Sequence, residues 1–152
     1  MFRIALFEPE IPPNTGNIIR LCANTGCALH LIEPLGFELD DKRLRRAGLD
    51  YSEWASVQTH SNWSAFRGSV EDSRIFAATT HGQRNYAEVD YLPTDTILLG
   101  PETRGLPKDI LEELGMEHCL RIPMRQHSRS LNLSNAAAVI LYEAWRQQQF
   151  AT

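Results

Sequence analysis

The chain contains little lysine, little cysteine and no long apolar run. Lysine occurs only as Lys42 and Lys108, so thirteen of the fifteen basic residues are arginines. The three cysteines are an odd number, which argues against a disulfide framework and indicates buried thiols. No apolar run reaches membrane-spanning length, and the N-terminal stretch MFRIALFEPE lacks the apolar core and cleavage site of a signal peptide. We therefore expect a cytoplasmic protein without a membrane segment.

The sequence also lacks the motifs of several enzyme classes. No G-x-G-x-x-G follows an expected strand and no G-x-x-x-x-G-K-[ST] occurs, which disfavours a nucleotide-binding enzyme of the Rossmann type and P-loop phosphoryl transfer. Cys22 and Cys27 have no second cysteine pair and no nearby histidine at metal-ligand spacing, so we expect no metal. No repeat, low-complexity tract or linker interrupts the chain, and we predict one domain over residues 1–152.

The charge is unevenly distributed. A net charge of −4 does not favour binding of nucleic acid by the molecule as a whole. Two basic islands stand out, one in DKRLRRAG with Lys42, Arg43, Arg45 and Arg46, the other in RIPMRQHSR with Arg121, Arg125 and Arg129. Each island alone is typical of an ordinary solvent-exposed protein surface with scattered charges. Because both lie near polar loops, and arginine binds phosphate in a bidentate manner, a local phosphate-binding surface is an equal alternative.

Strand-like and helix-like segments alternate along the chain. Apolar runs predict strands at 2–8, 27–33, 74–80, 95–100 and 118–122, with a weaker strand near Val57. The expected helices run from an N-cap at Asn14 or Thr15 to Gly26, from Asp40 or Asp41 to about Gly48, over 61–70, from Pro107 to Leu114, and after 132 to the C-terminus. This alternation predicts an α/β fold with a single, mainly parallel sheet flanked by helices.

Three loops follow expected strands, at the edge where parallel sheets bind ligands. PPNTGNIIR carries Asn14 and Arg20, although a helix cap and a surface arginine would also explain it. PETRGLP carries Glu102 in a loop stiffened by glycine and proline. In PMRQHSRSLNLSN, four side chains could cap the following helix where one is enough: Ser128, Ser130, Asn132 and Ser134. The surplus indicates that this last loop binds a ligand.

Taken together, NTGNIIR, GPETRGLP and RIPM…SRSLNLSNAAAVILYEAW are similar to the three motifs of the SpoU/TrmH branch of the SPOUT RNA methyltransferases. The resemblance covers nearly the whole chain and includes EPEIPPNTGNIIRLCANTG and DDKRLRRAGLDY. Within the branch, the chain resembles the single-domain tRNA 2'-O-ribose methyltransferases that modify the wobble cytidine or uridine. The resemblance implies a C-terminal trefoil knot, S-adenosylmethionine as cofactor, the tRNA anticodon stem-loop as partner, and a homodimer.

The resemblance also implies roles for individual residues. The expected cofactor-binding residues lie at strand ends and in the last loop: Ala78, Gly100, Ile122 and Ser130. The residues expected to be catalytic are Asn14, Arg20, Glu102 and Asn132, with Glu102 orienting Arg20 or Asn14. Family accounts make Arg20 the proton acceptor, but a guanidinium normally stays protonated. Two roles of Arg20 are therefore left open, that of a general base and that of an electrostatic stabiliser.

Partner-binding surfaces follow from charge and periodicity. We expect RNA contacts from Arg43, Arg45, Arg46 and Arg129. The C-terminal helix has one apolar stripe for the core and a second with Val139, Tyr142 and Trp145, which we predict to form the dimer interface. The alternative is that helices of the same chain cover both stripes. Two functional alternatives also remain: a non-catalytic RNA-binding module, and methylation of another tRNA or rRNA ribose.

Overall fold

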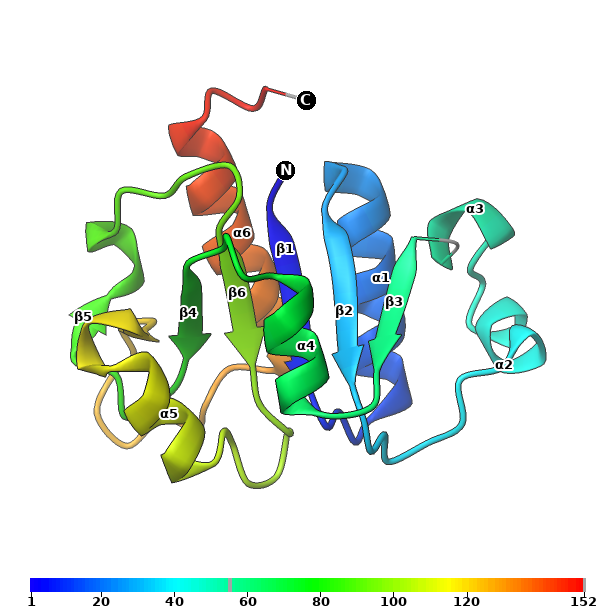
Figure 1. Cartoon of the computed structure of the whole chain (residues 1–152), viewed down its shortest axis with the longest axis horizontal. Helices are drawn as coiled ribbons and strands as arrows, with labels where there is room; N and C mark the ends of the chain where they lie inside the picture. Colours follow the sequence, from blue (N-terminus) through cyan, green and yellow to red (C-terminus); the bar gives the residue numbers. More distant parts are fainter. Residues whose placement is uncertain (55, 152) are drawn as a thin grey trace.

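The computed structural model describes residues 1–54 and 56–151, and within them the chain forms one seven-stranded sheet. The strand order is β3-β2-β1-β6-β4-β7-β5, and every neighbouring pair is parallel (Figure 1). The strands are β1 (Arg3–Phe7), β2 (Ala28–Ile32), β3 (Val57–His60), β4 (Ile75–Ala78), β5 (Arg84–Asn85), β6 (Thr96–Leu99) and β7 (Cys119–Arg121). The predicted α/β fold with a mainly parallel sheet is therefore confirmed.

Helices cover both faces of the sheet. They are α1 (Pro12–Thr25), α2 (Asp41–Arg46), α3 (Tyr51–Trp54), α4 (Trp63–Ser69), α5 (Lys108–Leu114) and α6 (Leu133–Gln147), with short 3-10 turns η1 (Tyr86–Glu88) and η2 (Met116–His118). In Figure 1, α4 and α5 lie in front of the sheet, and α1 and α6 lie behind it. None of the helices in the described part of the chain is long and apolar enough to cross a membrane.

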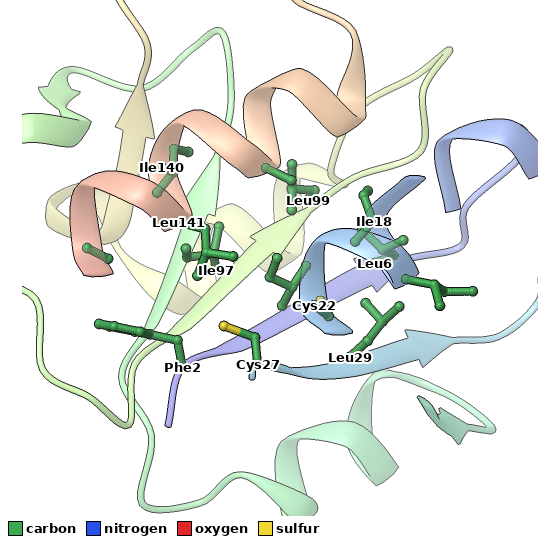
Figure 2. Close-up of a cluster of buried hydrophobic side chains, with 14 of the residues drawn as sticks. Phe2, Leu6, Ile18, Cys22, Cys27, Leu29, Ile97, Leu99, Ile140 and Leu141 are labelled. Atoms are coloured by element: carbon green, nitrogen blue, oxygen red, sulfur yellow. The ribbon is translucent and has the colours of Figure 1, made fainter. Parts of the chain in front are cut away.

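The core has two parts because side chains alternate between the faces of each strand. On β1, Ile4 and Leu6 belong to the cluster under α1 and α6, while Ala5 and Phe7 belong to the cluster under α4 and α5. Figure 2 shows the first cluster, with Ile18 and Cys22 of α1 and Ile140 and Leu141 of α6 over the sheet. The three cysteines are buried free thiols, as predicted.

The start of α1 differs from the prediction. The helix begins at Pro12, its N-cap is Ile11, and no side chain of the cap residue accepts a hydrogen bond. Asn14 and Thr15 lie inside the helix, so the prediction that one of them is the N-cap is wrong. The helix ends as predicted, with Gly26 in the left-handed conformation at φ 72°.

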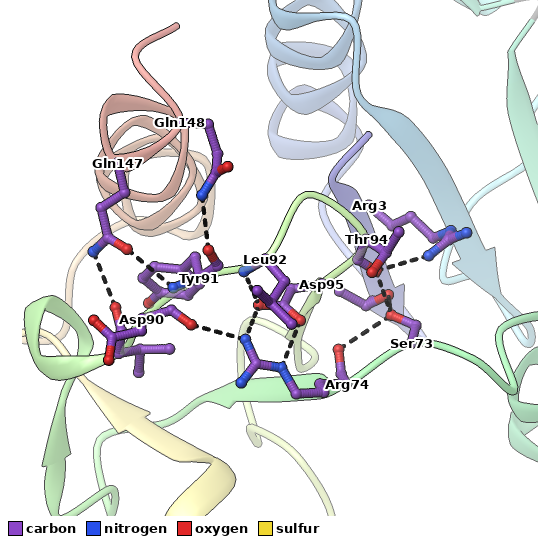
Figure 3. Close-up of polar contacts among 12 residues, drawn as sticks. Arg3, Ser73, Arg74, Asp90, Tyr91, Leu92, Thr94, Asp95, Gln147 and Gln148 are labelled. Atoms are coloured by element: carbon purple, nitrogen blue, oxygen red, sulfur yellow. Dashed lines mark hydrogen bonds and ion pairs between the residues drawn. The ribbon is translucent and has the colours of Figure 1, made fainter. Parts of the chain in front are cut away.

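A polar cluster lies at the N-terminal ends of β4 and β6, at the opposite ends of these strands from the loops that carry the motifs. Asp95 is fully buried and accepts hydrogen bonds from Nε and Nη2 of Arg74, at 2.8 and 2.6 Å, and from the Leu92 amide at 2.7 Å. Figure 3 shows this cluster next to Gln147 and Gln148, through which α6 bonds to the segment around Tyr91. Arg74 and Asp95 thus fix the segment from Asp90 to Leu92, and this segment binds the C-terminal end of α6. The trefoil knot remains a prediction from the resemblance.

Candidate active site

A pocket of about 560 Å³ lies at the carboxyl ends of β4, β6 and β7, next to the first turns of α1 and α6. This volume is in the range of small-molecule binding sites. All four residues expected to bind the cofactor line it: Ala78, Gly100, Ile122 and Ser130. Three of the four residues expected to be catalytic line it as well: Asn14, Glu102 and Asn132. The structure therefore brings together seven predicted residues from five segments of the chain.

Glycine is required where the loops around the pocket pack on one another. A Cβ at Gly100 would lie 2.4 Å from the Leu106 nitrogen, inside any normal contact distance. A Cβ at Gly82 would lie 2.6 Å from the carbonyl carbon of Leu120. These close approaches fold the 100–106 loop back on itself and press the turn after β4 against β7. The pocket wall is therefore partly backbone.

Glu102 connects the 100–106 loop to the start of α1. Its carboxylate accepts hydrogen bonds from the amides of Glu10 and Ile11, at 2.8 and 3.1 Å. It also accepts a hydrogen bond from Nδ2 of Asn14 at 3.3 Å. Of the two partners expected for Glu102, the structure therefore shows Asn14. The contacts found for Arg20 in the described residues do not include Glu102.

Asn14 and Asn132 continue this network to α6. Asn14 is buried, and its Oδ1 accepts a hydrogen bond from Nδ2 of Asn132 at 2.8 Å. Oδ1 of Asn132 caps α6 by accepting hydrogen bonds from the amide of Ser134 at 2.9 Å and from its hydroxyl at 2.6 Å. Each amide uses its donor and its acceptor, so both orientations are fixed. Asn132 is thus the cap among the four polar candidates, and Ser130 faces the pocket instead.

Two acidic residues that the sequence analysis did not assign reinforce the same junction. Glu10 Oε1 accepts hydrogen bonds from the amide of Thr103 at 3.0 Å and from its hydroxyl at 2.8 Å. The backbone hydrogen bond from Thr103 is the main cause that lowers the pKa of Glu10. Glu8 forms an ion pair with Arg104 at 2.5 Å, and this hydrogen bond raises the pKa of Arg104. We call these contacts, together with those of Glu102, the acidic clasp. Its signal in the sequence was two acids near the end of the first expected strand, Glu8 and Glu10.

Arg20 lies apart from this cluster. It is on α1, about two turns beyond the helix start, and its side chain is half exposed. Its Nη2 donates a hydrogen bond to the Gly48 carbonyl at 2.6 Å, and its Nε lies 3.4 Å from a carboxylate oxygen of Glu53. Arg20 is not among the residues that line the pocket. Within one chain, the structure does not bring Arg20 to the expected cofactor site.

The arginines expected to contact RNA differ from one another. Arg43 is engaged by Glu38 at 3.4 Å and by Asp40 at 3.5 Å. Arg45 and Arg46 line an open hollow of about 470 Å³ with Lys42 and Asp41, and among the described residues neither has an ion pair. Arg129 is exposed in the loop between β7 and α6. The hollow on α2 is therefore the part of the first island that is available to an anion.

The two stripes of α6 have different environments. Ala137, Ile140, Leu141 and Ala144 are buried in the core. On the second stripe, Tyr142 is 45% exposed and its ring packs edge-on against Trp145 at 5.7 Å between centroids. Trp145 is partly covered by Phe150. The alternative that helices of the same chain cover both stripes therefore does not hold at Tyr142.

Comparisons with known proteins agree with the fold and show the family. Residues 1–142 match the model of the SpoU rRNA methylase family. A tRNA (cytidine(34)-2'-O)-methyltransferase of Saccharophagus degradans is 65% identical over 99% of this chain and 98% of its own. A solved structure from work on the 2-OH methylation of C/U34 on tRNA has a TM-score of 0.90 at 41% identity, over 99% of this chain and 98% of that one. The SpoU methyltransferase AviRb of Streptomyces viridochromogenes, in complex with the cofactor AdoMet, has a TM-score of 0.83 at 26% identity, over 97% of this chain and 57% of that longer one.

Proposed function

This chain belongs to the SpoU rRNA methylase family, and from that premise we propose that it methylates the ribose 2'-hydroxyl of nucleotide 34 of tRNA, a cytidine or uridine, with S-adenosylmethionine as methyl donor. The observation that carries the proposal is the 65% identity, over 99% of the chain, to a methyltransferase of that specificity. The pocket at the strand ends, with Asn14, Glu102 and Asn132 on its wall, supports the proposal because its volume is in the range of small-molecule binding sites.

The pocket fits the cofactor chemically. The partly exposed apolar residues of its lining, Leu106, Ile122 and Leu133, offer surface for an adenine ring, and backbone groups at the strand ends supply hydrogen bonds. We assign the binding of S-adenosylmethionine to Ala78, Gly100, Ile122 and Ser130. The bound cofactor supplies an electrophilic methyl group on a sulfonium.

The residues of the chain position the ribose and stabilise charge. Glu102 fixes Asn14, and Asn132 fixes it from the other side, so both amides are held rigidly at the pocket wall. Rigid positioning of two reactants supplies a large part of the rate of a transfer reaction. Both groups that contact Arg20 are hydrogen-bond acceptors, which suits a charged guanidinium. We therefore assign Arg20 the stabilisation of the negative charge that develops on the 2'-oxygen, while the proton of the attacking hydroxyl passes to water.

A homodimer completes this arrangement. Because Arg20 does not line the pocket of its own chain, we propose that it acts on the pocket of a second copy. The second stripe of α6, on which Tyr142 is exposed and Val139 and Trp145 are partly exposed, is the surface that we assign to the interface. Equal mixing of an Arg20→Ala protein with a Glu102→Ala protein tests this: mixed dimers should regain turnover that neither parent has.

The anticodon stem-loop of a cytoplasmic tRNA is the proposed partner. The hollow with Lys42, Arg45 and Arg46, together with Arg129, provides cations for its phosphates. Because Arg43 already has two acidic neighbours, we expect its share in RNA binding to be smaller. Affinity for tRNA should fall steeply with salt, as it does when phosphate contacts dominate.

The function is tested by incubating the protein with labelled cofactor and with tRNA, native or unmodified, or rRNA. Mass spectrometry of nuclease fragments locates the methyl group. We expect 2'-O-methylation at nucleotide 34 of tRNA. A methyl group on another tRNA or rRNA ribose would establish the alternative substrate, and binding without turnover would establish the non-catalytic RNA-binding module.

A further inference from the structure

The guanidinium of Arg20 is held by two groups from one short segment of the chain. Its Nη2 donates a hydrogen bond to the Gly48 carbonyl at 2.6 Å, and its Nε lies 3.4 Å from Oε1 of Glu53. Gly48 lies in the connection between α2 and α3, and Glu53 lies in α3. The arrangement differs from a solvated surface arginine, because the first of these contacts is short and made to fixed backbone.

Gly48 presents its carbonyl because of the way α2 ends. The Gly48 amide donates to the Arg45 carbonyl at 3.0 Å, and the Leu49 amide donates to the Leu44 carbonyl at 3.1 Å. This pair of hydrogen bonds is a Schellman motif, which requires a left-handed residue, and Gly48 has φ 76°. The buried side chains of Leu44 and Leu49 complete the motif. The Gly48 carbonyl therefore points away from α2 and is available to Arg20.

Glu53 is fixed in a similar way. Its Oε2 accepts a hydrogen bond from the Asp50 amide at 2.6 Å, and its own amide donates to the Asp50 carbonyl at 2.9 Å. This local pairing leaves Oε1 directed at Arg20. The side chain of Glu53 is only 20% exposed, so it cannot swing freely into water as most surface acids do.

From this geometry we infer that Gly48 and Glu53 are positioning residues for Arg20. They hold its guanidinium in one orientation on the surface of α1. The same segment begins with α2, whose Arg45 and Arg46 face the anion-accessible hollow. The groups that bind RNA phosphate and those that orient Arg20 therefore belong to one continuous piece of chain. The inference rests on the proposed role of Arg20 in methyl transfer.

The variant Glu53→Gln separates positioning from a structural role. The Asp50 amide and Arg20 are met by different carboxylate oxygens, Oε2 and Oε1, and glutamine has an oxygen at only one of these two positions. If the glutamine oxygen keeps the hydrogen bond from the Asp50 amide, the glutamine NH₂ group faces Arg20. Two donors then face each other, so Arg20 loses this contact. We expect kcat to fall about tenfold, which is about 1.4 kcal/mol. The dissociation constants for cofactor and tRNA should stay within about twofold of the parent, with the melting temperature unchanged.

Glu113→Gln is the matched control. Glu113 likewise shares its carboxylate between an arginine, Arg67 at 3.2 Å, and a second donor, Nε1 of Trp63 at 2.9 Å. It lies on α5, on the opposite face of the sheet from α1 (Figure 1). This variant should keep the parent kcat.

Three further outcomes distinguish failure of this inference from failure of the proposed function. If Arg20→Ala is inactive while Glu53→Gln has the parent kcat, the positioning role is overturned and the catalytic role of Arg20 stands. A fall in kcat that only follows a fall in melting temperature or in folded fraction also overturns the positioning role. If Arg20→Ala keeps its activity, the catalytic role of Arg20 fails, and the inference fails with it.

Discussion

Asn14 is the residue through which the two ends of the site are joined. Its amide donates to Glu102 in the 100–106 loop and accepts from Asn132 at the start of α6. Because it is buried, neither hydrogen bond is exchanged for water at low cost. The side chains at the pocket wall therefore hold one another in place before any ligand binds. Arg20, by contrast, is held by a separate segment, so its contribution can be removed without disturbing the pocket.

That separation leads to a prediction for Arg20→Ala. Turnover should fall at least about a hundredfold, a typical loss when a stabiliser of transition-state charge is removed. Cofactor affinity should stay within about twofold, because Arg20 does not line the pocket. Single-turnover kinetics and calorimetric titration with S-adenosylmethionine measure the two effects. A variant that keeps more than about a tenth of the parent turnover would show that Arg20 is not a key catalytic group.

The buried His30, which contacts His60, predicts a loss of stability in acid. Nδ1 of His30 lies 2.9 Å from Nε2 of His60. Burial, then His60 and Arg3, lower the pKa of His30 from 6.5 to about 4. Below about pH 6.5, His30 therefore binds a proton in the unfolded chain but not in the native protein. Native stability should fall by about 2 kcal/mol from about pH 7 to about pH 5 from this residue alone.

Urea unfolding of the parent and of His30→Leu at those two pH values tests this effect. The variant should lose less stability in acid than the parent. His127→Gln, which removes an exposed histidine, should behave like the parent. Equal acid sensitivity of the parent and His30→Leu would contradict the assignment.

At the scale of elements, the acidic clasp links the loop after β1 to the loop after β6. Glu10→Ala removes the acceptor for the amide and hydroxyl of Thr103. Since the 100–106 loop forms one wall of the pocket, we expect the dissociation constant for S-adenosylmethionine to rise about tenfold. Calorimetric titration measures it. Glu71→Ala, at an exposed acid outside the clasp, is the control. Unchanged cofactor affinity in Glu10→Ala would mean that the clasp does not shape the pocket.

Elements with a strong local signal could be predicted from the sequence. The continuous apolar strands β1 and β6, the Gly26 terminus of α1 and the Asp40 cap of α2 all have local causes. The start of α1 could not be predicted in this way. The amides that precede it are satisfied by Glu102, which is 92 residues from Glu10 in the sequence. A prediction from local sequence pairs such amides with the nearest polar side chain, Asn14 or Thr15, and here that prediction was wrong.

Short elements and long-range contacts limited the prediction further. β5 has two residues and forms only by pairing with β7, and α3 has four, so neither is long enough to show a periodic pattern. The pocket residues could be named because the motifs resemble a family. The positions of Glu10 and Glu53 could not, because each depends on a segment distant in sequence, Thr103 for one and Arg20 for the other.

At the scale of the whole molecule, the second apolar stripe of α6, with Tyr142 exposed on it, predicts a dimer. The double variant Tyr142→Asp, Trp145→Asp places two charges on this stripe, which a buried interface does not tolerate. We expect sedimentation to show a folded monomer with little activity, since Arg20 would no longer reach a second pocket. If the double variant is a folded dimer with full activity, the interface lies elsewhere. A dimeric parent together with a monomeric variant would support the assignment of the interface to this stripe.

The central claim is methyl transfer to one ribose hydroxyl of tRNA, and a single-atom change in the substrate tests it most directly. A tRNA that carries 2'-deoxyribose only at nucleotide 34 lacks the proposed acceptor and keeps every base. Its matched control carries the same change at the neighbouring anticodon nucleotide. With labelled S-adenosylmethionine, we predict no methyl incorporation into the first tRNA and incorporation close to that of unmodified tRNA into the control. Equal incorporation into both would contradict the assignment.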